Sequence, residues 1–120
     1  MSFLRSSIPH FAADESIGTL FRISLGVEFI DDVDRVRPNA LQRSSAFSRH
    51  LREALEYLLR ERPCDVAEWA SLTGVAFTDG AHLYGYLRDL FDYFYGDRSD
   101  PPVPPDPEAP MPAWVAEHWP

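Results

Sequence analysis

The chain of 120 residues contains one cysteine, Cys64, and no lysine. A single cysteine excludes both an intramolecular disulfide and a cysteine-based metal cluster. Hydrophobic runs are also short, since none approaches the roughly 18 apolar residues of a transmembrane helix. The first residues lack the continuous apolar stretch of a signal peptide. We therefore expect a cytoplasmic protein without disulfides or membrane spans.

The motifs of common enzyme classes are missing as well. The sequence has no phosphate-binding glycine loop, no HExxH zinc motif, no paired CxxC and no nucleophile elbow. The acidic cluster of Asp31, Asp32 and Asp34 lacks the central glycine and terminal glutamate of a calcium loop. Cys64 follows a proline and is interpreted as a small apolar core residue. We expect a protein that is not an enzyme and needs neither a cofactor nor a metal.

Histidine occurs at four positions, and none has the setting of a catalytic base. His50 falls beside apolar positions of a predicted helix, which favours a packed or partly exposed ring. His10 and His118 lie in terminal segments, which are poor scaffolds for a positioned base. His82 lies in the first turn of a predicted helix and belongs to the flank described below.

The charge balance is strongly acidic, with 19 aspartates and glutamates against 11 arginines and a net charge of −8. This surplus disfavours contact with the phosphate backbone of nucleic acids and with an anionic membrane surface. It favours a basic protein partner, because complementary fields speed encounter and suppress incorrect pairings. We therefore expect a protein partner with a basic surface, no nucleic acid and no membrane.

Proline divides the chain into two parts. Eight of the eleven prolines lie in residues 99–120, a segment without arginine, and the run PPVPPDP favours extended polyproline II structure. We expect a helical domain at 1–98 and an acidic, proline-rich tail at 99–120. Trp114 and Trp119 predict that the tail docks on the domain as an extended strap. The alternative is a free tail whose tryptophans dock onto another protein.

Three segments have the pattern of amphipathic helices. In SSAFSRHLREALEYLLRER, residues 44–62, apolar residues recur at three- and four-residue spacing, one of the leading serines can cap the start, and Pro63 ends the pattern. A shorter helix is predicted after Asp65, with Gly74 as its stop. A third begins at the FTDG turn, residues 77–80, whose Thr or Asp can serve as cap.

The segment 17–33 is ambiguous between helix and strand. Its apolar residues form an unbroken four-residue row, which favours a helix, but its central residues also alternate, which favours a strand. The length of the pattern favours the helix, with Ser16 as cap and Pro38 as terminator. The predicted fold class is therefore mainly α, a compact domain of about four helices. The alternative is an α+β domain with a short hairpin at about residues 19–30.

The third predicted helix carries many rings and carboxylates in LYGYLRDLFDYFYGDRSD, residues 83–100. At about 100° per residue, its leucines and phenylalanines form one core stripe, and the tyrosines fall outside it. Tyrosines mixed with carboxylates are typical of protein interfaces, although such rings also pack at the margin of a core or under a proline-rich tail. The candidate partner-binding residues, which we call the tyrosine flank, are His82, Tyr86, Asp89, Asp92, Tyr93, Asp97 and Asp100.

The stretch YGYLRDLFDYFYGD, within a small, acidic, cysteine-poor and mostly helical chain, resembles the immunity proteins of bacterial toxin systems. The resemblance implies a bacterial, cytoplasmic monomer or weak dimer that binds one cognate toxin domain tightly and inhibits it. The anchors implied are Tyr86, Asp89, Tyr93 and Asp97, with Asp92 and Asp100 adding negative charge.

A second hypothesis comes from a different class of protein. It treats the chain as a structural or regulatory accessory subunit that assembles through an apolar groove and the tail. The two hypotheses differ in the tyrosine flank, which is exposed in an immunity protein and buried at the protein's own interface in an accessory subunit.

Overall fold

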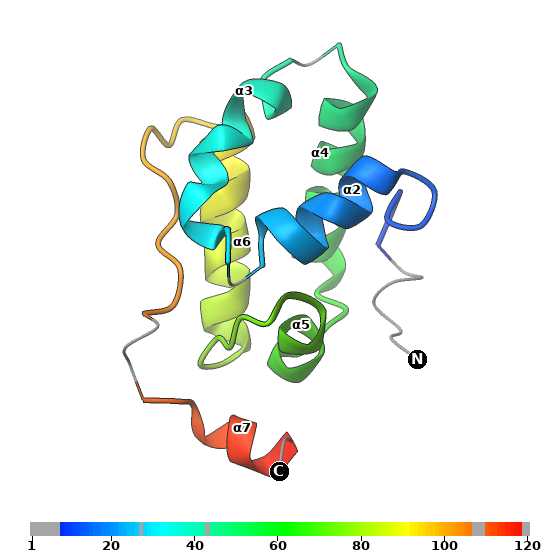
Figure 1. The fold of residues 1–120 in the computed structure, drawn as a ribbon. Coiled ribbons are helices and arrows are strands. Elements are labelled where there is room, and N and C mark those ends of the chain that lie inside the picture. Colours follow the sequence, from blue (N-terminus) through cyan, green and yellow to red (C-terminus); the bar gives the residue numbers. More distant parts are fainter. Residues whose placement is uncertain (1–7, 27, 43, 107–109, 119–120) are drawn as a thin grey trace.

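The structure, a computed structural model, describes residues 8–26, 28–42, 44–106 and 110–118 (Figure 1). It is mainly helical, as the sequence predicts, and the described residues contain no strand. The alternative of a short N-terminal hairpin is therefore wrong. No helix in the described ranges is both long and apolar enough to cross a membrane.

The central helix α4, Ala46–Glu61, packs beside α6, Gly80–Tyr95 (Figure 1). Ser45 caps α4, because its hydroxyl oxygen accepts a hydrogen bond from the backbone N–H of Ser48 at 3.1 Å. The helix ends at Arg62, which adopts a left-handed conformation with φ of 45° before the following proline. The predicted cap and end of this helix are confirmed.

Helix α5, Val66–Thr73, begins with a reciprocal cap. The Asp65 carboxylate accepts a hydrogen bond from the Glu68 backbone N–H, and the Glu68 carboxylate accepts one from the Asp65 N–H. The helix ends at Gly74, whose φ of 80° lies in the left-handed region that glycine adopts without strain. Asp79 caps α6 through a single hydrogen bond, which its carboxylate accepts from the His82 backbone N–H at 2.8 Å. The caps at Asp65 and Asp79 and the stop at Gly74 therefore lie where the sequence predicts them.

The N-terminal region is helical but interrupted. α2, Glu15–Thr19, continues directly into the π-helix η1, Leu20–Ser24, whose wide turn is closed by a 2.9 Å bond from the Leu25 N–H to the Leu20 carbonyl. The chain then turns at Gly26, where a Cβ would lie 2.7 Å from a backbone oxygen of the preceding turn. The prediction of one continuous helix is wrong, because the chain doubles back at this glycine.

Beyond the turn, the 3-10 helix η2, Ile30–Arg35, and α3, Arg37–Ala40, bring the chain alongside α6 (Figure 1). Pro38 lies in the first turn of α3, where its missing N–H is not needed, so it starts this helix instead of ending the one before it. The predicted cap at Ser16 is also wrong. Asp14 caps α2 and accepts a hydrogen bond from the Ser16 backbone N–H.

The hydrophobic core lies between α4 and α6 and is closed by α2, η1 and α5. Trp69 of α5 meets Phe21 of η1 edge to face, with 6.0 Å between their ring centroids. Such a core requires the leucines of both long helices to point inward, as their spacing predicts. The largest fully buried side chains are Trp69, Phe21, Phe77, Phe94, Ile17, Leu25, Leu51, Leu55, Leu58, Leu83 and Leu87.

The tail leaves α6, runs beside η2 and α3, and ends in the short helix α7, Ala113–His118, against α5 (Figure 1). Pro102 is buried. The indole N–H of Trp114 donates a hydrogen bond to the Phe77 carbonyl, with 2.7 Å between nitrogen and oxygen. The sequence predicts an extended strap and does not predict this terminal helix. The predicted docking of Trp119 lies outside the described residues.

Candidate functional site

The predicted partner-binding flank lies along α6, and its members differ in depth. The side chains of Tyr86 and Tyr93 are each only 4% exposed. Both rings are therefore part of the core, which agrees with the packing alternative that the sequence leaves open. The other five residues reach the surface: His82, Asp89 and Asp92 are half-buried, and Asp97 and Asp100 are exposed.

Tyr93 is covered by α3 of the same chain. Arg37 places its guanidinium over the tyrosine ring, with 4.5 Å between Cζ and the ring centroid, so the cation is attracted by the negative face of the ring. The Nε of Arg37 is buried and has no hydrogen-bond partner among the described residues. The contact with Tyr93 therefore helps to hold this guanidinium in place.

Tyr86 is buried two turns further toward the start of α6. Its ring packs on Phe77, with 5.3 Å between centroids. Burial, and to a lesser extent the negative charge of Asp31, raises the pKa of the Tyr86 hydroxyl. Within the described part of the chain this hydroxyl has no hydrogen-bond partner. An unpaired buried hydroxyl destabilises a fold by about 1–3 kcal/mol.

Two segments of the same chain therefore account for the burial of the flank. Arg37 of α3 covers Tyr93, and Phe77 of the α5–α6 loop packs on Tyr86. The sequence indicates the tail or another protein as what covers these tyrosines, and it does not indicate either of these two segments. The signal was weak, because the apolar residues of 30–36 also fit the continuous helix that the sequence predicts.

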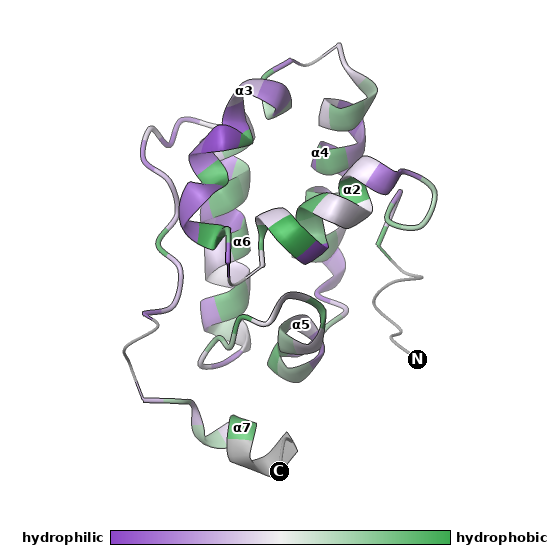
Figure 2. Ribbon diagram, viewed as in Figure 1, coloured by the Kyte–Doolittle hydropathy of each residue, from purple (hydrophilic) through white to green (hydrophobic). Residues whose placement is uncertain are grey.

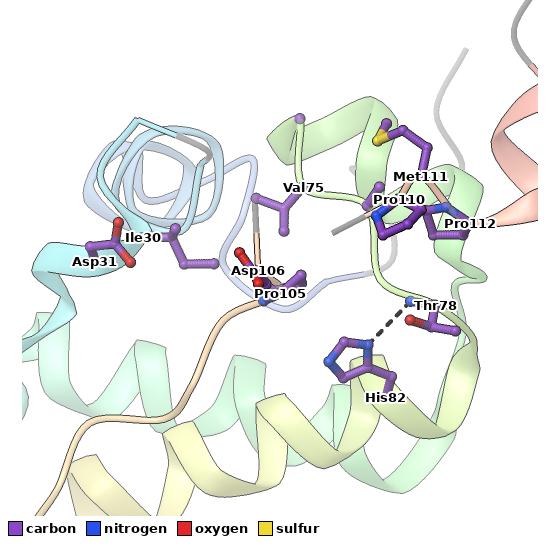
Figure 3. A pocket seen from close by; sticks show the side chains of 12 residues that line it. Ile30, Asp31, Val75, Thr78, His82, Pro105, Asp106, Pro110, Met111 and Pro112 are labelled. Carbon is purple, nitrogen blue, oxygen red and sulfur yellow. Dashed lines mark hydrogen bonds between the residues drawn. The ribbon is translucent and has the colours of Figure 1, made fainter. Parts of the chain in front are cut away.

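A cavity of about 380 Å³ opens between η2, the α5–α6 loop and the tail (Figure 3). Two carboxylates, Asp31 and Asp106, line it, and His82 is the one basic side chain among the described lining residues. In Figure 3, Asp31 lies at one end of the cavity and Pro110 and Pro112 lie at the other, with Pro105 between them. The apolar lining comes from Ile30, Val75, Ala76, Pro105, Pro110, Met111 and Pro112.

His82 is oriented by the start of α6. Its Nδ1 accepts a hydrogen bond from the backbone N–H of Thr78 at 3.2 Å, as Figure 3 shows. The neutral ring therefore carries its proton on Nε2. The Phe77 ring meets the imidazole edge to face at 4.9 Å between centroids. These contacts hold His82 in a defined orientation at the wall of the cavity.

Exposed carboxylates lie on η2, which also carries the exposed Arg35, and just beyond the end of α6. We call this surface the acidic face, and Figure 2 shows η2 and α3 as hydrophilic segments. Arg98 follows Asp97, and its Nε donates a hydrogen bond to the Asp100 carbonyl at 2.9 Å, which holds the guanidinium close to the backbone. The acidic face consists of Asp31, Asp32, Asp34, Asp97 and Asp100.

Cys64 is packed in the core, as predicted. The Tyr84 hydroxyl donates a hydrogen bond to the Cys64 carbonyl at 2.8 Å and accepts one from the Cys64 N–H at 3.1 Å. Burial raises the pKa of the Cys64 thiol, which disfavours the thiolate form that a nucleophile needs.

A polar cluster that sequence reasoning missed joins the N-terminal segment to α4. His50 Nδ1 lies 2.6 Å from a carboxylate oxygen of Asp14, and His10 Nε2 lies 3.1 Å from a carboxylate oxygen of Glu53. The partners are 36 and 43 residues apart, so no local pattern predicts them. Among the described residues, no group of three His, Cys, Asp or Glu side chains is arranged to hold a metal ion.

The turn at Gly26 leaves two large apolar side chains in solvent. Ile23 is 50% exposed and Phe29 is 47% exposed, and both line the same two shallow depressions beside the turn. We call this pair the apolar patch.

Comparison with protein-family models, with curated proteins and with solved structures finds no match for the chain. The assignment of a function therefore depends on the chemistry of the acidic face, the cavity and the apolar patch.

Proposed function

We propose that the chain is a non-enzymatic protein-binding inhibitor whose acidic face contacts a basic partner. The observation that carries this proposal is the exposure of five aspartates on η2 and beyond α6, in a chain of net charge −8. Such a surface attracts a basic partner over a distance and rejects acidic ones. The resemblance to bacterial immunity proteins supports a toxin domain as the partner and the cytoplasm as the place of action.

The flank residues have two different roles in this proposal. Tyr86 and Tyr93 are too deeply buried to touch a partner, and Tyr93 supports α3 through its contact with Arg37. Asp97 and Asp100 belong to both the flank and the acidic face and make the flank's main contacts. The half-buried Asp89, Asp92 and His82 add contacts beyond the acidic face.

The test uses the toxin domain encoded by the gene adjoining this one. The two proteins are mixed, and the dissociation constant and association rate are measured at low and at high salt. Binding by the acidic face predicts an association rate that falls steeply as salt rises. The variant Asp32→Lys/Asp34→Lys/Asp97→Lys/Asp100→Lys is expected to bind at least 100-fold more weakly.

The matched control reverses exposed carboxylates that lie outside the acidic face. Glu15 at the start of α2 and Glu61 at the end of α4 are both exposed, and Glu15→Lys/Glu61→Lys should reduce affinity only slightly. The control reverses half as many charges, so a loss of binding free energy half as large as that of the acidic-face variant would mean that net charge alone is responsible. A neighbouring toxin domain that does not bind, or that binds the acidic-face variant unchanged, contradicts the proposal.

The apolar patch favours a second candidate function, that of an accessory subunit assembling through its own surface. Ile23 and Phe29 stand side by side in solvent at the turn, where burial against a second protein would stabilise a complex. This function predicts a stable dimer in solution that Ile23→Ser/Phe29→Ser converts to a monomer. Light scattering after size exclusion measures both masses, and a monomeric wild-type protein excludes the homodimeric form of this candidate.

A further inference from the structure

The cavity beside His82 combines apolar walls with one oriented hydrogen-bond donor. Most of its lining is apolar, and the tail contributes a wall of proline rings (Figure 3). Because the Nδ1 of His82 accepts the Thr78 hydrogen bond, its Nε2 carries a proton. This N–H has no hydrogen-bond partner among the described residues, and in Figure 3 it lies on the side of the ring turned away from Thr78. Such a cavity suits an apolar group that ends in a hydrogen-bond acceptor.

We propose that this cavity binds one tyrosine side chain of the basic partner. The inference rests on the proposed function, because it names a side chain that the partner contributes. The ring packs against Val75 and the prolines of the tail, and its hydroxyl oxygen accepts the hydrogen bond from His82 Nε2. The hydroxyl proton stays available to water or to Thr78, which also lines the cavity.

The position of the cavity supports this occupant. Asp31 belongs both to the acidic face and to the cavity lining, so a partner that contacts the acidic face also reaches the cavity. Aromatic side chains that fill a pocket supply much of the binding energy of protein interfaces, and tyrosine is among the most frequent of them. Both lining aspartates are exposed, so a ring in the cavity leaves them in contact with water.

Tyrosine fits this cavity better than the other aromatic side chains. A phenylalanine ring would displace water from the cavity and leave the His82 N–H without an acceptor. A tryptophan indole offers only an N–H donor, which cannot accept this hydrogen bond. The cavity volume of about 380 Å³ lies near the lower end of the range of small-ligand pockets, about 300–1,000 Å³. That size suits a single ring and not an extended ligand.

The test titrates the intact protein with three capped tripeptides that differ only in the central residue. The acetyl-Gly-Tyr-Gly-amide probe is compared with its phenylalanine and tryptophan counterparts. Amide shifts of Val75, Ala76 and His82 in NMR spectra locate and quantify binding. The tyrosine peptide is expected to bind about five- to tenfold more tightly than either counterpart, because its hydroxyl gains a hydrogen bond. Equal binding of the tyrosine and phenylalanine peptides, or no saturable shift at these three amides, would overturn the proposal.

Two variants make the test specific to the cavity. Ala76 lines it, so Ala76→Leu should fill part of the space and weaken binding of the tyrosine peptide at least tenfold. The matched control Ala13→Leu changes an exposed alanine outside the cavity and should leave binding unchanged. His82→Phe keeps a ring at this position but removes the N–H donor, so it should abolish the preference for tyrosine over phenylalanine. A preference that survives His82→Phe, or unchanged affinity in Ala76→Leu, contradicts the proposal.

The outcomes separate this inference from the function on which it rests. The charge-reversal test of the proposed function changes Asp32, Asp34, Asp97 and Asp100, none of which lines the cavity. If the toxin domain binds but Ala76→Leu leaves that binding intact, the tyrosine site is wrong and the inhibitor function stands. If the tyrosine peptide binds in the cavity and the toxin domain does not bind at all, the inhibitor function is wrong and the cavity remains a site for a phenol ring.

Discussion

His10 and His50 stack ring on ring, with 3.8 Å between centroids and 13° between planes. Each ring also meets a carboxylate, that of Glu53 for His10 and that of Asp14 for His50. His10 reaches this position with φ of 66°, in the left-handed region where histidine is found more often than most residues. The stack fastens the N-terminal segment to α4 through polar contacts on the rim of the core.

The pair of Asp14 and His50 predicts a dependence of stability on pH. The hydrogen bond from His50 holds the pKa of Asp14 below its ordinary value, although partial burial opposes the shift. A carboxyl group whose pKa is lower in the folded state stabilises the fold above its unfolded pKa of about 3.9. That contribution is lost as the pH falls through the folded pKa.

We therefore expect His50→Ala to move the pKa of Asp14 upward toward the ordinary value. NMR titration of the Asp14 carboxyl carbon measures this pKa directly. The loss of stability on going from pH 6 to pH 2 should also be smaller in the variant, as measured by urea unfolding. Glu53→Gln is the control, because Glu53 pairs with His10 and not with Asp14. An Asp14 pKa unchanged by His50→Ala would mean that the pair does not persist in solution.

Two buried tyrosines on α6 predict opposite responses to loss of a hydroxyl. The Tyr84 hydroxyl makes two hydrogen bonds with the Cys64 backbone, so Tyr84→Phe should lower the free energy of unfolding by about 1–2 kcal/mol. The Tyr86 hydroxyl is buried without a partner in the described structure, so Tyr86→Phe should raise the free energy of unfolding by about 1 kcal/mol. Urea unfolding at pH 7 compares the two variants, and a loss in both would indicate that Tyr86 has acquired a partner, such as a bound water.

Tyr93 and Asp89 are neighbours on the flank but should differ widely in their effect on stability. Tyr93 is buried beneath Arg37, so Tyr93→Ala should lower the free energy of unfolding by about 3–5 kcal/mol. Asp89 is half-buried, and the contact of its carboxylate with Arg98 is long at 3.9 Å. Asp89→Ala should therefore change the free energy of unfolding by less than about 0.5 kcal/mol. Chemical denaturation measures both, and a stable Tyr93→Ala variant would show that its ring is not part of the core.

Docking of the tail predicts a local effect of Trp114. The hydrogen bond from its indole to the Phe77 carbonyl contributes about 1 kcal/mol, which is roughly a fivefold change in the equilibrium between docked and open tail. Trp114→Phe should therefore raise the rate of protease cleavage within residues 99–106 about fivefold, with little change in global unfolding. Val103→Ala is the control, because Val103 is 75% exposed and should leave cleavage unchanged. Equal rates for wild type and Trp114→Phe would mean that this bond does not hold the tail.

The helices α4, α5 and α6 were predictable because their signals are local. Asp65 and Glu68 form a reciprocal cap within four residues, and Gly74 supplies the left-handed stop that follows. The leucine spacing of α4 and α6 then determines which side faces inward. Each of these features depends on atoms only a turn or two apart, so it can be predicted from the local sequence without knowledge of the rest of the fold.

The N-terminal region was harder to predict because its structure depends on a contact with another element. Its apolar residues suit one long helix, but a Cβ at Gly26 would crowd the backbone of Thr73 in α5 as well as that of the preceding turn. The interruption lets η2 and α3 run back alongside α6. Sequence periodicity does not predict this return, which determines which parts of α6 are covered.

Sequence alone determined the helical class, the three capped helices and the acidity, since capping, spacing and charge are properties of neighbouring residues. The tertiary structure decided the depth of the tyrosine flank. Tyr93 is buried because Arg37 lies over its ring, and Tyr86 because it packs on Phe77. The tertiary structure also brings Asp31 and Asp106, which are 75 residues apart in the sequence, to one cavity. Contacts across such sequence separations depend on how the helices pack together. An amphipathic pattern predicts which face of a helix is buried but not which element covers it.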